Sequence, residues 1–209
     1  EDLMGADLHY VALSRRSFLL ASSGAAIGVS FGLTGRAEAA PAPQTYQPSA
    51  WVTIDSDGTI TLMSPSAEMG QGSMTGVPRC LAEELDADWA KVRVLQAPSI
   101  PSEFGNPLLY GAMGTHADFS IQGYFEKVRL IGAQVRRVLI LTAAGQFNVD
   151  PNQLITEPSV VVHPASGRKL SYGELARVAV VPKELPKLTA ADLKPRDRWR
   201  LIGRDSLRV

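Results

Sequence analysis

Cysteine is nearly absent from this sequence, since Cys80 is the only one in 209 residues. A single thiol excludes an intrachain disulfide, and it excludes an iron–sulfur cluster ligated by this chain alone. Any electron transfer through such a cluster would need another subunit. Cys80 lies near Val77 and Leu81 in a helical pattern, which favours a small buried hydrophobic side chain over a reactive thiol.

An excess of charge of either sign is also missing. Lys and Arg together number 21, and so do Asp and Glu. Proteins that bind nucleic acid neutralise phosphates with a basic excess, so this balance argues against a nucleic-acid partner. Hydrophobic residues make up 45% of the chain and charged residues 20%, a composition typical of a folded globular protein.

The apolar run near the N-terminus, residues 21–33, is rich in Gly and Ser and is soon followed by Arg36. It falls short of the roughly 20 apolar residues that a membrane-spanning helix needs. Residues 14–20 (SRRSFLL) match a twin-arginine export signal, and residues 37–39 (AEA) fit a small-residue cleavage site. We expect residues 1–39 to be a signal peptide. The protein would then be periplasmic, and any attachment to the outer face of the inner membrane would be made through partners.

The next residues have the composition of a linker. Residues 40–50 are rich in Pro, Ala and Gln, which indicates an extended segment with nothing to pack against. We assign a domain to residues 51–180. Residues 181–209, again rich in Pro and charge, form an extended tail in this interpretation.

Alternating apolar residues predict three strands. The runs at 51–55 and 59–63 are separated by a short turn that contains Asp57 and Gly58, a pattern typical of a β-hairpin. Residues 91–96 alternate again and predict a third strand.

Two main helices are predicted, at about 75–85 and 122–146. In the longer one, an apolar face that indicates core packing is formed by Phe125, Val128, Ile131, Val135, Val138 and Leu139. We interpret the basic residues of this helix, Arg129 and Arg136 among them, as a solvated or subunit-facing surface. A capping box at Ser171 and Glu174 predicts a further short helix. The expected fold class is α+β, a small mixed sheet with two main helices.

A glycine loop lies between the hairpin and the first helix, at residues 68–72 (EMGQG). Gly70 and Gly72 allow backbone N–H groups to approach an anionic or pterin-like ligand, and the amide of Gln71 offers both a donor and an acceptor. The predicted order is a strand, the glycine loop and then a helix. In this order the loop can place an anionic group at the N-terminus of the helix. The loop is therefore a candidate ligand site.

Glu83 and Glu84 are the adjacent carboxylates that could suggest acid–base chemistry. Neighbouring positions on a helix point in different directions, so the two cannot share a site. We interpret them as surface and capping charge.

The chain resembles the amino-terminal part of the molybdenum-cofactor-binding large subunit of the xanthine dehydrogenase and aldehyde oxidase family. Its branch is similar to isoquinoline 1-oxidoreductases and membrane-associated aldehyde dehydrogenases. The resemblance is carried, in order along the chain, by residues 14–20 (SRRSFLL), 51–54 (WVTI), 68–72 (EMGQG), 81–86 (LAEELD), 91–94 (KVRV), 128–133 (VRLIGA), 166–168 (SGR) and 201–203 (LIG).

That resemblance implies a pterin cofactor, molybdopterin or its cytosine dinucleotide form, bound in part by Met69, Gly70, Gln71 and Gly72. Residues 114–120 (GTHADFS) resemble a second turn that lines the cofactor, with Thr115 and Ser120 as contacts. Asp118 replaces a serine of the family pattern there, and a carboxylate directed inward would repel a phosphate. His116 is expected to be structural.

The family activity implied is a hydroxylation in which water supplies the oxygen, molybdenum takes two electrons and a [2Fe–2S] subunit removes them. The implied partners are the remainder of the large subunit, a small iron–sulfur subunit and a cytochrome c subunit as a further acceptor. Family large subunits are several times longer, and their catalytic glutamate lies beyond Val209. We therefore assign no catalytic residue and no metal ligand here, and we expect a split or truncated subunit that is inactive alone.

Two other readings stay open. The chain could be a non-catalytic exported α+β interaction module from a truncated gene. A periplasmic small-ligand binder has less support, because no aromatic or charged cluster marks a pocket.

Overall fold

A computed structural model describes residues 44–204. The signal peptide predicted at 1–39 and the last five residues of the tail lie outside the described residues. The α-helices are α2 (Ser73–Leu85), α3 (Pro101–Phe104), α4 (Phe119–Phe147) and α5 (Tyr172–Ala176). The strands are β1 (Thr45–Ser49), β2 (Val52–Asp55), β3 (Ile60–Ser64), β4 (Val92–Gln96), β5 (Ile155–Glu157), β6 (Val160–His163) and β7 (Arg168–Ser171). Short 3₁₀ turns lie at Trp89–Lys91, Pro107–Leu109, Pro151–Gln153, Ala190–Asp192 and Arg196–Arg198.

The first sheet has the order β1-β2-β3-β4. Strands β2 and β3 form the predicted antiparallel hairpin, with Val52 opposite Leu62. Strand β4 then pairs with β3 in parallel, with Ile60 opposite Val92, and α2 lies in the connection that a parallel pair requires. The sheet is therefore mixed, as predicted.

Residues 45–49 correct the linker predicted at 40–50. They form the edge strand β1, in which Tyr46 pairs with Ile54 of β2. The Tyr46 side chain is only 3% exposed and belongs to the core. The expectation that this segment packs against nothing is wrong here, because its extended backbone pairs with β2 and the buried Tyr46 ring adds apolar burial.

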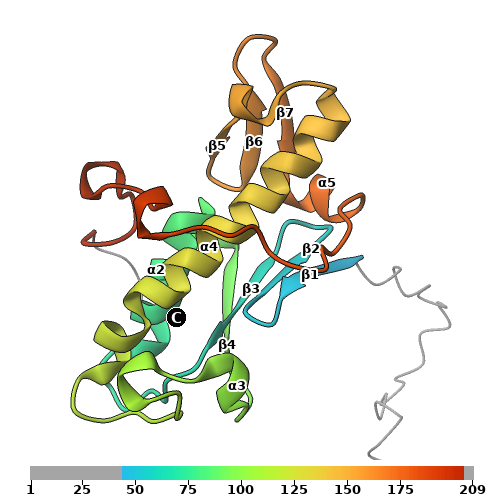
Figure 1. Ribbon diagram of the computed structural model, residues 1–209. Coiled ribbons are helices and arrows are strands. Elements are labelled where there is room, and N and C mark those ends of the chain that lie inside the picture. The colour runs from blue at the N-terminus through green and yellow to red at the C-terminus, as the bar shows by residue number, and fades with distance from the viewer. Residues whose placement is uncertain (1–43, 205–209) are drawn as a thin grey trace, which may run out of the picture. The chain divides into compact units, whose positions relative to one another are not determined.

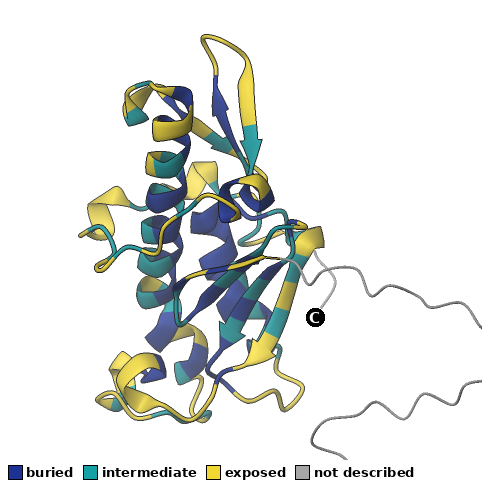
Figure 2. Ribbon diagram, turned by 90° about the vertical axis from the view of Figure 1, so that its right-hand side faces the viewer, coloured by how far each residue is buried: buried dark blue, intermediate teal, exposed yellow. Residues whose placement is uncertain are grey.

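Helices α2 and α4 pack closely against each other, as Figure 1 shows. A Cβ added at Gly132 of α4 would overlap the carbonyl oxygen of Leu81 in α2, so a residue without a side chain is required at this crossing. The apolar face predicted for α4 is confirmed, since Val128, Val135 and Leu139 are buried, and Figure 2 shows its buried and exposed stripes.

Cys80 is buried in α2, and burial raises the pKa of its thiol to about 11. A thiol with that pKa stays protonated at neutral pH and is a poor nucleophile. The sequence-based interpretation of Cys80 as a packing residue is confirmed.

The second sheet has the order β5-β6-β7 and is antiparallel throughout. The helix α5 follows it, with the predicted capping box between Ser171 and Glu174. The α+β class with a small mixed sheet and two main helices is confirmed. Among residues 44–204 no helix, including the 29-residue α4, has a run apolar enough to cross a lipid bilayer.

Glu83 and Glu84 are not surface charges, which corrects the sequence-based interpretation. Both side chains are 0% exposed. The Glu84 carboxylate accepts hydrogen bonds from Nε and Nη2 of Arg129 at 2.9 and 2.6 Å, so Arg129 is not on a solvated surface either. The two glutamates are buried because each has polar partners that replace water.

The tail is held against α2 by Glu83. The Glu83 Oε2 atom accepts hydrogen bonds from the backbone N–H groups of Arg200, Leu201 and Ile202 at 2.9, 2.6 and 3.1 Å. Lys194 of the same tail donates from Nζ to the Glu83 carboxylate at 3.4 Å. Residues 194–202 are therefore a docked part of the fold, whereas the sequence predicted an extended tail.

Candidate functional site

The loop after β3 and the turn before α4 meet at one hollow of about 720 Å³. Of the six residues predicted to bind a cofactor, five line it: Met69, Gln71, Gly72, Thr115 and Ser120. Gly70 belongs to the same loop but does not line the hollow. The structure thus brings together two segments that the sequence singled out separately.

Both glycines of the loop have left-handed backbone conformations, with φ of 96° at Gly70 and 88° at Gly72. A side chain at either position would be strained in this region of φ. A Cβ at Gly70 would meet no atom within 4 Å, so the glycine is required there by the backbone turn and not by crowding. The two residues turn the chain from the sheet into α2.

The carboxylate of Glu68 caps the N-terminus of α2. Its Oε1 accepts the N–H groups of Gly70 and Gly72 at 2.8 and 2.9 Å, and its Oε2 accepts that of Met74 at 3.0 Å. A negative charge at a helix N-terminus is stabilised by the unpaired N–H groups and the helix dipole. In this conformation the N–H groups of Gly70 and Gly72 donate to Glu68 and not to a ligand. The predicted approach of these groups to an anionic or pterin-like ligand stays a prediction.

The amide of Gln71 braces the loop. Its Nε2 donates to the carbonyl of Ala67 at 2.8 Å and to Oγ of Ser73 at 2.7 Å, and its Oε1 accepts the N–H of Met69 at 2.6 Å. Both amide hydrogens are used, so the capacity that remains on Gln71 is the second lone pair of Oε1. Toward a ligand, the side chain in this conformation can act as an acceptor.

Thr115 joins the second segment to the first. Its Oγ1 accepts the backbone N–H of Ala67 at 2.8 Å, while its own hydroxyl hydrogen meets no acceptor among residues 44–204. Ser120, in the first turn of α4, is 7% exposed, and its hydroxyl likewise lacks a partner in that part of the chain. Two hydroxyl donors thus remain at the hollow.

The turn into α4 has an uncommon backbone. Ala117 and Asp118 both have positive φ, 49° and 58°, and Asp118 is the N-cap of α4 without a side-chain cap hydrogen bond. Two consecutive left-handed residues without glycine cost energy, and such conformations concentrate at functional sites. The His116 ring, which also lines the hollow, lies 5.9 Å from the ring of Phe119.

The lining suits a flat heterocycle better than a phosphate. It offers hydroxyl donors at Thr115 and Ser120, an acceptor at Gln71, and apolar surface at Met69 and Ile121. Among residues 44–204 no Lys or Arg lines it, and the Asp118 carboxylate would repel an anion. A pterin ring, which carries both donors and acceptors, therefore fits these residues, and its phosphate would have to be bound elsewhere.

Sequence reasoning missed three contributors to this site. Glu68 belongs to the EMGQG motif, but its capping role was not predicted, although a glutamate shortly before a helix is a signal for it. Ser73 and Ile121, which also line the hollow, carry no sequence signal of their own. Among residues 44–204 no group of His, Cys, Asp and Glu is arranged to hold a metal ion.

Comparison with known proteins gives a family for this chain. Residues 13–202 match the family described as "Molybdopterin cofactor-binding domain". The chain is 36% identical to isoquinoline 1-oxidoreductase subunit beta of Brevundimonas diminuta, over 95% of this chain and 30% of that protein. It is 32% identical to the membrane-bound aldehyde dehydrogenase [pyrroloquinoline-quinone] of Gluconacetobacter polyoxogenes, over 95% of this chain and 26% of that protein. The chain thus spans less than a third of the length of these relatives.

Solved structures with a similar arrangement include the Cu,Mo-CO dehydrogenase in its carbon monoxide-reduced state and quinoline 2-oxidoreductase from Pseudomonas putida 86. The TM-scores are 0.47 and 0.44, at 15% and 16% identity, over 59% and 60% of this chain and 15% of each of those chains. Residues 13–202 match this family, and two relatives are more than 30% identical to the chain. The chain therefore belongs to the molybdopterin cofactor-binding domain family.

Proposed function

We propose that this chain is a piece of the cofactor-binding subunit of an exported molybdenum hydroxylase that oxidises aldehydes or N-heterocycles. The observation that carries the proposal is the meeting of the Gln71 loop and the Thr115 turn at one hollow, in a chain of this family. The names of the relatives, an isoquinoline oxidoreductase subunit and an aldehyde dehydrogenase, support the substrate classes.

The residues at the hollow would hold the pterin part of the cofactor. Gln71 would accept a hydrogen bond through Oε1, and Thr115 and Ser120 would donate through their hydroxyl groups. Met69, with 69% of its surface exposed, would cover an apolar edge of the ring. When bound, the molybdenum-pterin group supplies two-electron redox chemistry with water as the source of oxygen.

Several parts of that reaction lie beyond the residues of this chain. The catalytic base, the phosphate contacts and the [2Fe–2S] acceptor would come from the remainder of the large subunit and from a small iron–sulfur subunit. A cytochrome c subunit is a further acceptor in this proposal. The proposal includes two forms of the cofactor, molybdopterin and its cytosine dinucleotide. They differ in a part that would bind outside the hollow.

Copurification tests the proposal. The full chain, affinity-tagged and purified from its native host, should bring with it an iron–sulfur subunit and a dye-reducing activity toward an aldehyde or an N-heterocycle. A chain that is recovered alone and without activity would support the other candidate, a non-catalytic interaction module.

Export is a separate part of the proposal, supported by the motif at Arg15 and Arg16. The double variant Arg15→Lys/Arg16→Lys keeps the charge but removes the twin-arginine motif, so it should remain in the cytoplasm while the parent chain reaches the periplasm. Equal distribution of parent and variant in cell fractions would refute this route.

A further inference from the structure

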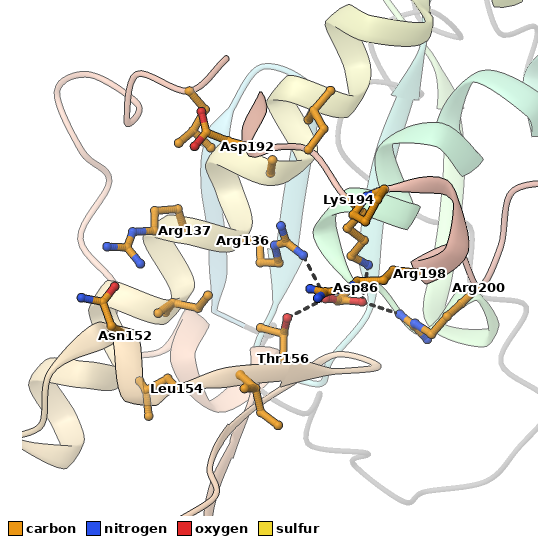
Figure 3. Close-up of a pocket in the computed structure, with 16 residues that line it drawn as sticks. Asp86, Arg136, Arg137, Asn152, Leu154, Thr156, Asp192, Lys194, Arg198 and Arg200 are labelled. Atoms are coloured by element: carbon orange, nitrogen blue, oxygen red, sulfur yellow. Dashed lines mark hydrogen bonds and ion pairs between the residues drawn. The ribbon is translucent and has the colours of Figure 1, made fainter. Parts of the chain in front are cut away.

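A second hollow, of about 740 Å³, lies between α4, β5 and the docked tail. Figure 3 shows it with the side chains that line it. Basic side chains outnumber acidic ones in its lining. The two carboxylates are Asp86 and Asp192, and the cations are Arg136, Arg137, Lys194, Arg198 and Arg200. The balance of charge inside this hollow differs from that of the whole chain, which is neutral.

Asp86 forms ion pairs with three of these cations. It ends α2, and its carboxylate contacts Arg136 at 3.2 Å, Lys194 at 2.5 Å and Arg200 at 2.7 Å. Lys194 and Arg136 also approach the buried carboxylates of Glu83 and Glu84, at 3.4 and 3.9 Å. The other carboxylate of the hollow, Asp192, accepts hydrogen bonds from the backbone N–H and the hydroxyl of Thr189.

Two arginines of the hollow remain without a partner. The side chains of Arg137 and Arg198 make no hydrogen bond or ion pair with any residue between 44 and 204. Figure 3 shows Arg136 turned toward Asp86 and Arg137, its neighbour on α4, turned away from it. The exposed side-chain amide of Asn152 is likewise unpaired within the described residues.

Several guanidinium groups in one hollow repel one another, and an anion placed among them would relieve that repulsion. Guanidinium groups bind carboxylates through two parallel hydrogen bonds, as a fork that a single ammonium cannot provide. The same wall carries apolar side chains, Leu154 and Ile155, next to the arginines. That combination suits a carboxylate carried on a hydrocarbon stem better than an inorganic phosphate.

We propose that this hollow, defined by Arg137 and Arg198, is a binding site for carboxylate groups. The carboxylates come either from acidic side chains of a protein segment or from a free polycarboxylate. The site is separate from the hollow at Gln71, shares no lining residue with it, and does not depend on a cofactor.

The test is calorimetric titration of the full chain at low ionic strength with three probes: an acetylated hexaglutamate peptide, citrate and inorganic phosphate. The variant Arg137→Gln/Arg198→Gln removes the two unpaired cations. Arg93→Gln/Lys183→Gln is the matched control, because it removes the same charge from exposed positions outside the hollow. The single variant Arg198→Gln, at an exposed position, serves if the double variant does not fold.

The peptide, citrate or both should bind the parent chain, and the double variant should bind at least about tenfold more weakly while the control is unchanged. Binding of the peptide alone identifies a protein source, and binding of citrate alone a free polycarboxylate. Absence of binding by both, equal weakening in the control, an unaffected double variant, or tighter binding of phosphate would overturn the proposal.

Discussion

The Oγ1 atom of Thr115 accepts the backbone N–H of Ala67 at 2.8 Å, across 48 residues of sequence. Ala67 directly precedes the EMGQG loop, and its carbonyl accepts a hydrogen bond from Gln71 at 2.8 Å. Ala67 is therefore the point at which the turn before α4 is joined to the glycine loop. The hollow at Gln71 depends on this junction.

Thr115→Val should loosen that junction. Valine has nearly the same shape but cannot accept a hydrogen bond, so the N–H of Ala67 loses its partner. We expect a loss of about 1 kcal/mol in the free energy of unfolding and faster hydrogen exchange at the Ala67 amide. Thr53→Val, at a partly buried strand position whose hydroxyl makes no hydrogen bond with residues 44–204, should leave this amide unchanged. Unchanged exchange in Thr115→Val would argue against the junction.

Two glycines of α4 should respond in opposite ways to alanine. Gly132→Ala places a Cβ against the Leu81 carbonyl and should destabilise the protein by about 2 kcal/mol. Gly145, in the same helix, has nothing within 4 Å of an added Cβ, so Gly145→Ala should stabilise it by up to about 1 kcal/mol. Urea unfolding measures both values. Equal effects of the two changes would contradict the close crossing of α2 and α4.

Glu83→Gln should release the tail. The change removes the charge that accepts three backbone N–H groups and leaves Lys194 without its Glu83 carboxylate partner, so we expect a loss of about 3 kcal/mol. The amides of residues 200–202 should exchange faster. Glu126→Gln, at an exposed position of α4, is the control and should be neutral. Protected tail amides in Glu83→Gln would show that the tail is held by other contacts.

Asp86 should make stability depend on pH in the acid range. Burial raises the pKa of its carboxyl group, but hydrogen bonds from Lys194 and Thr156 outweigh burial and hold the pKa below its usual value. A lowered pKa in the folded state means that the stabilisation is present above the unfolded-state pKa, about 4, and is lost as pH falls through the lower folded-state value. Between pH about 5 and about 3, Asp86→Asn should therefore lose less stability than the parent chain. Parallel curves for the two proteins would contradict this role.

Local patterns predicted the local structure well. The hairpin β2–β3 follows from alternating residues around Asp57 and Gly58, because those signals act over a few positions. The capping box at Ser171 is similarly local. The glycine loop has positive φ at both Gly70 and Gly72, a conformation that glycine adopts at little cost.

Burial of polar residues was not predictable from local patterns. Glu83 and Glu84 read as surface charge because their partners, such as Lys194, lie 111 and 110 residues away. The edge strand at Tyr46 was missed for the same reason, since its composition is that of a linker while its ring packs in the core. At the candidate site, Thr115 and Ser120 were found through the family resemblance, whereas Glu68 and Ser73 required the hydrogen bonds of the folded loop.

Molybdenum content tests the central claim most directly. The full chain, purified with its partners from the native host, should contain about one metal per chain by elemental mass spectrometry, since the proposal places one pterin cofactor at the hollow. Gln71→Ala removes the three hydrogen bonds that brace the loop and should retain much less metal, whereas Gln153→Ala, at an exposed position outside the hollow, should match the parent. Equal molybdenum in all three proteins would contradict the assignment of this loop, and its absence from the parent would contradict the proposed function.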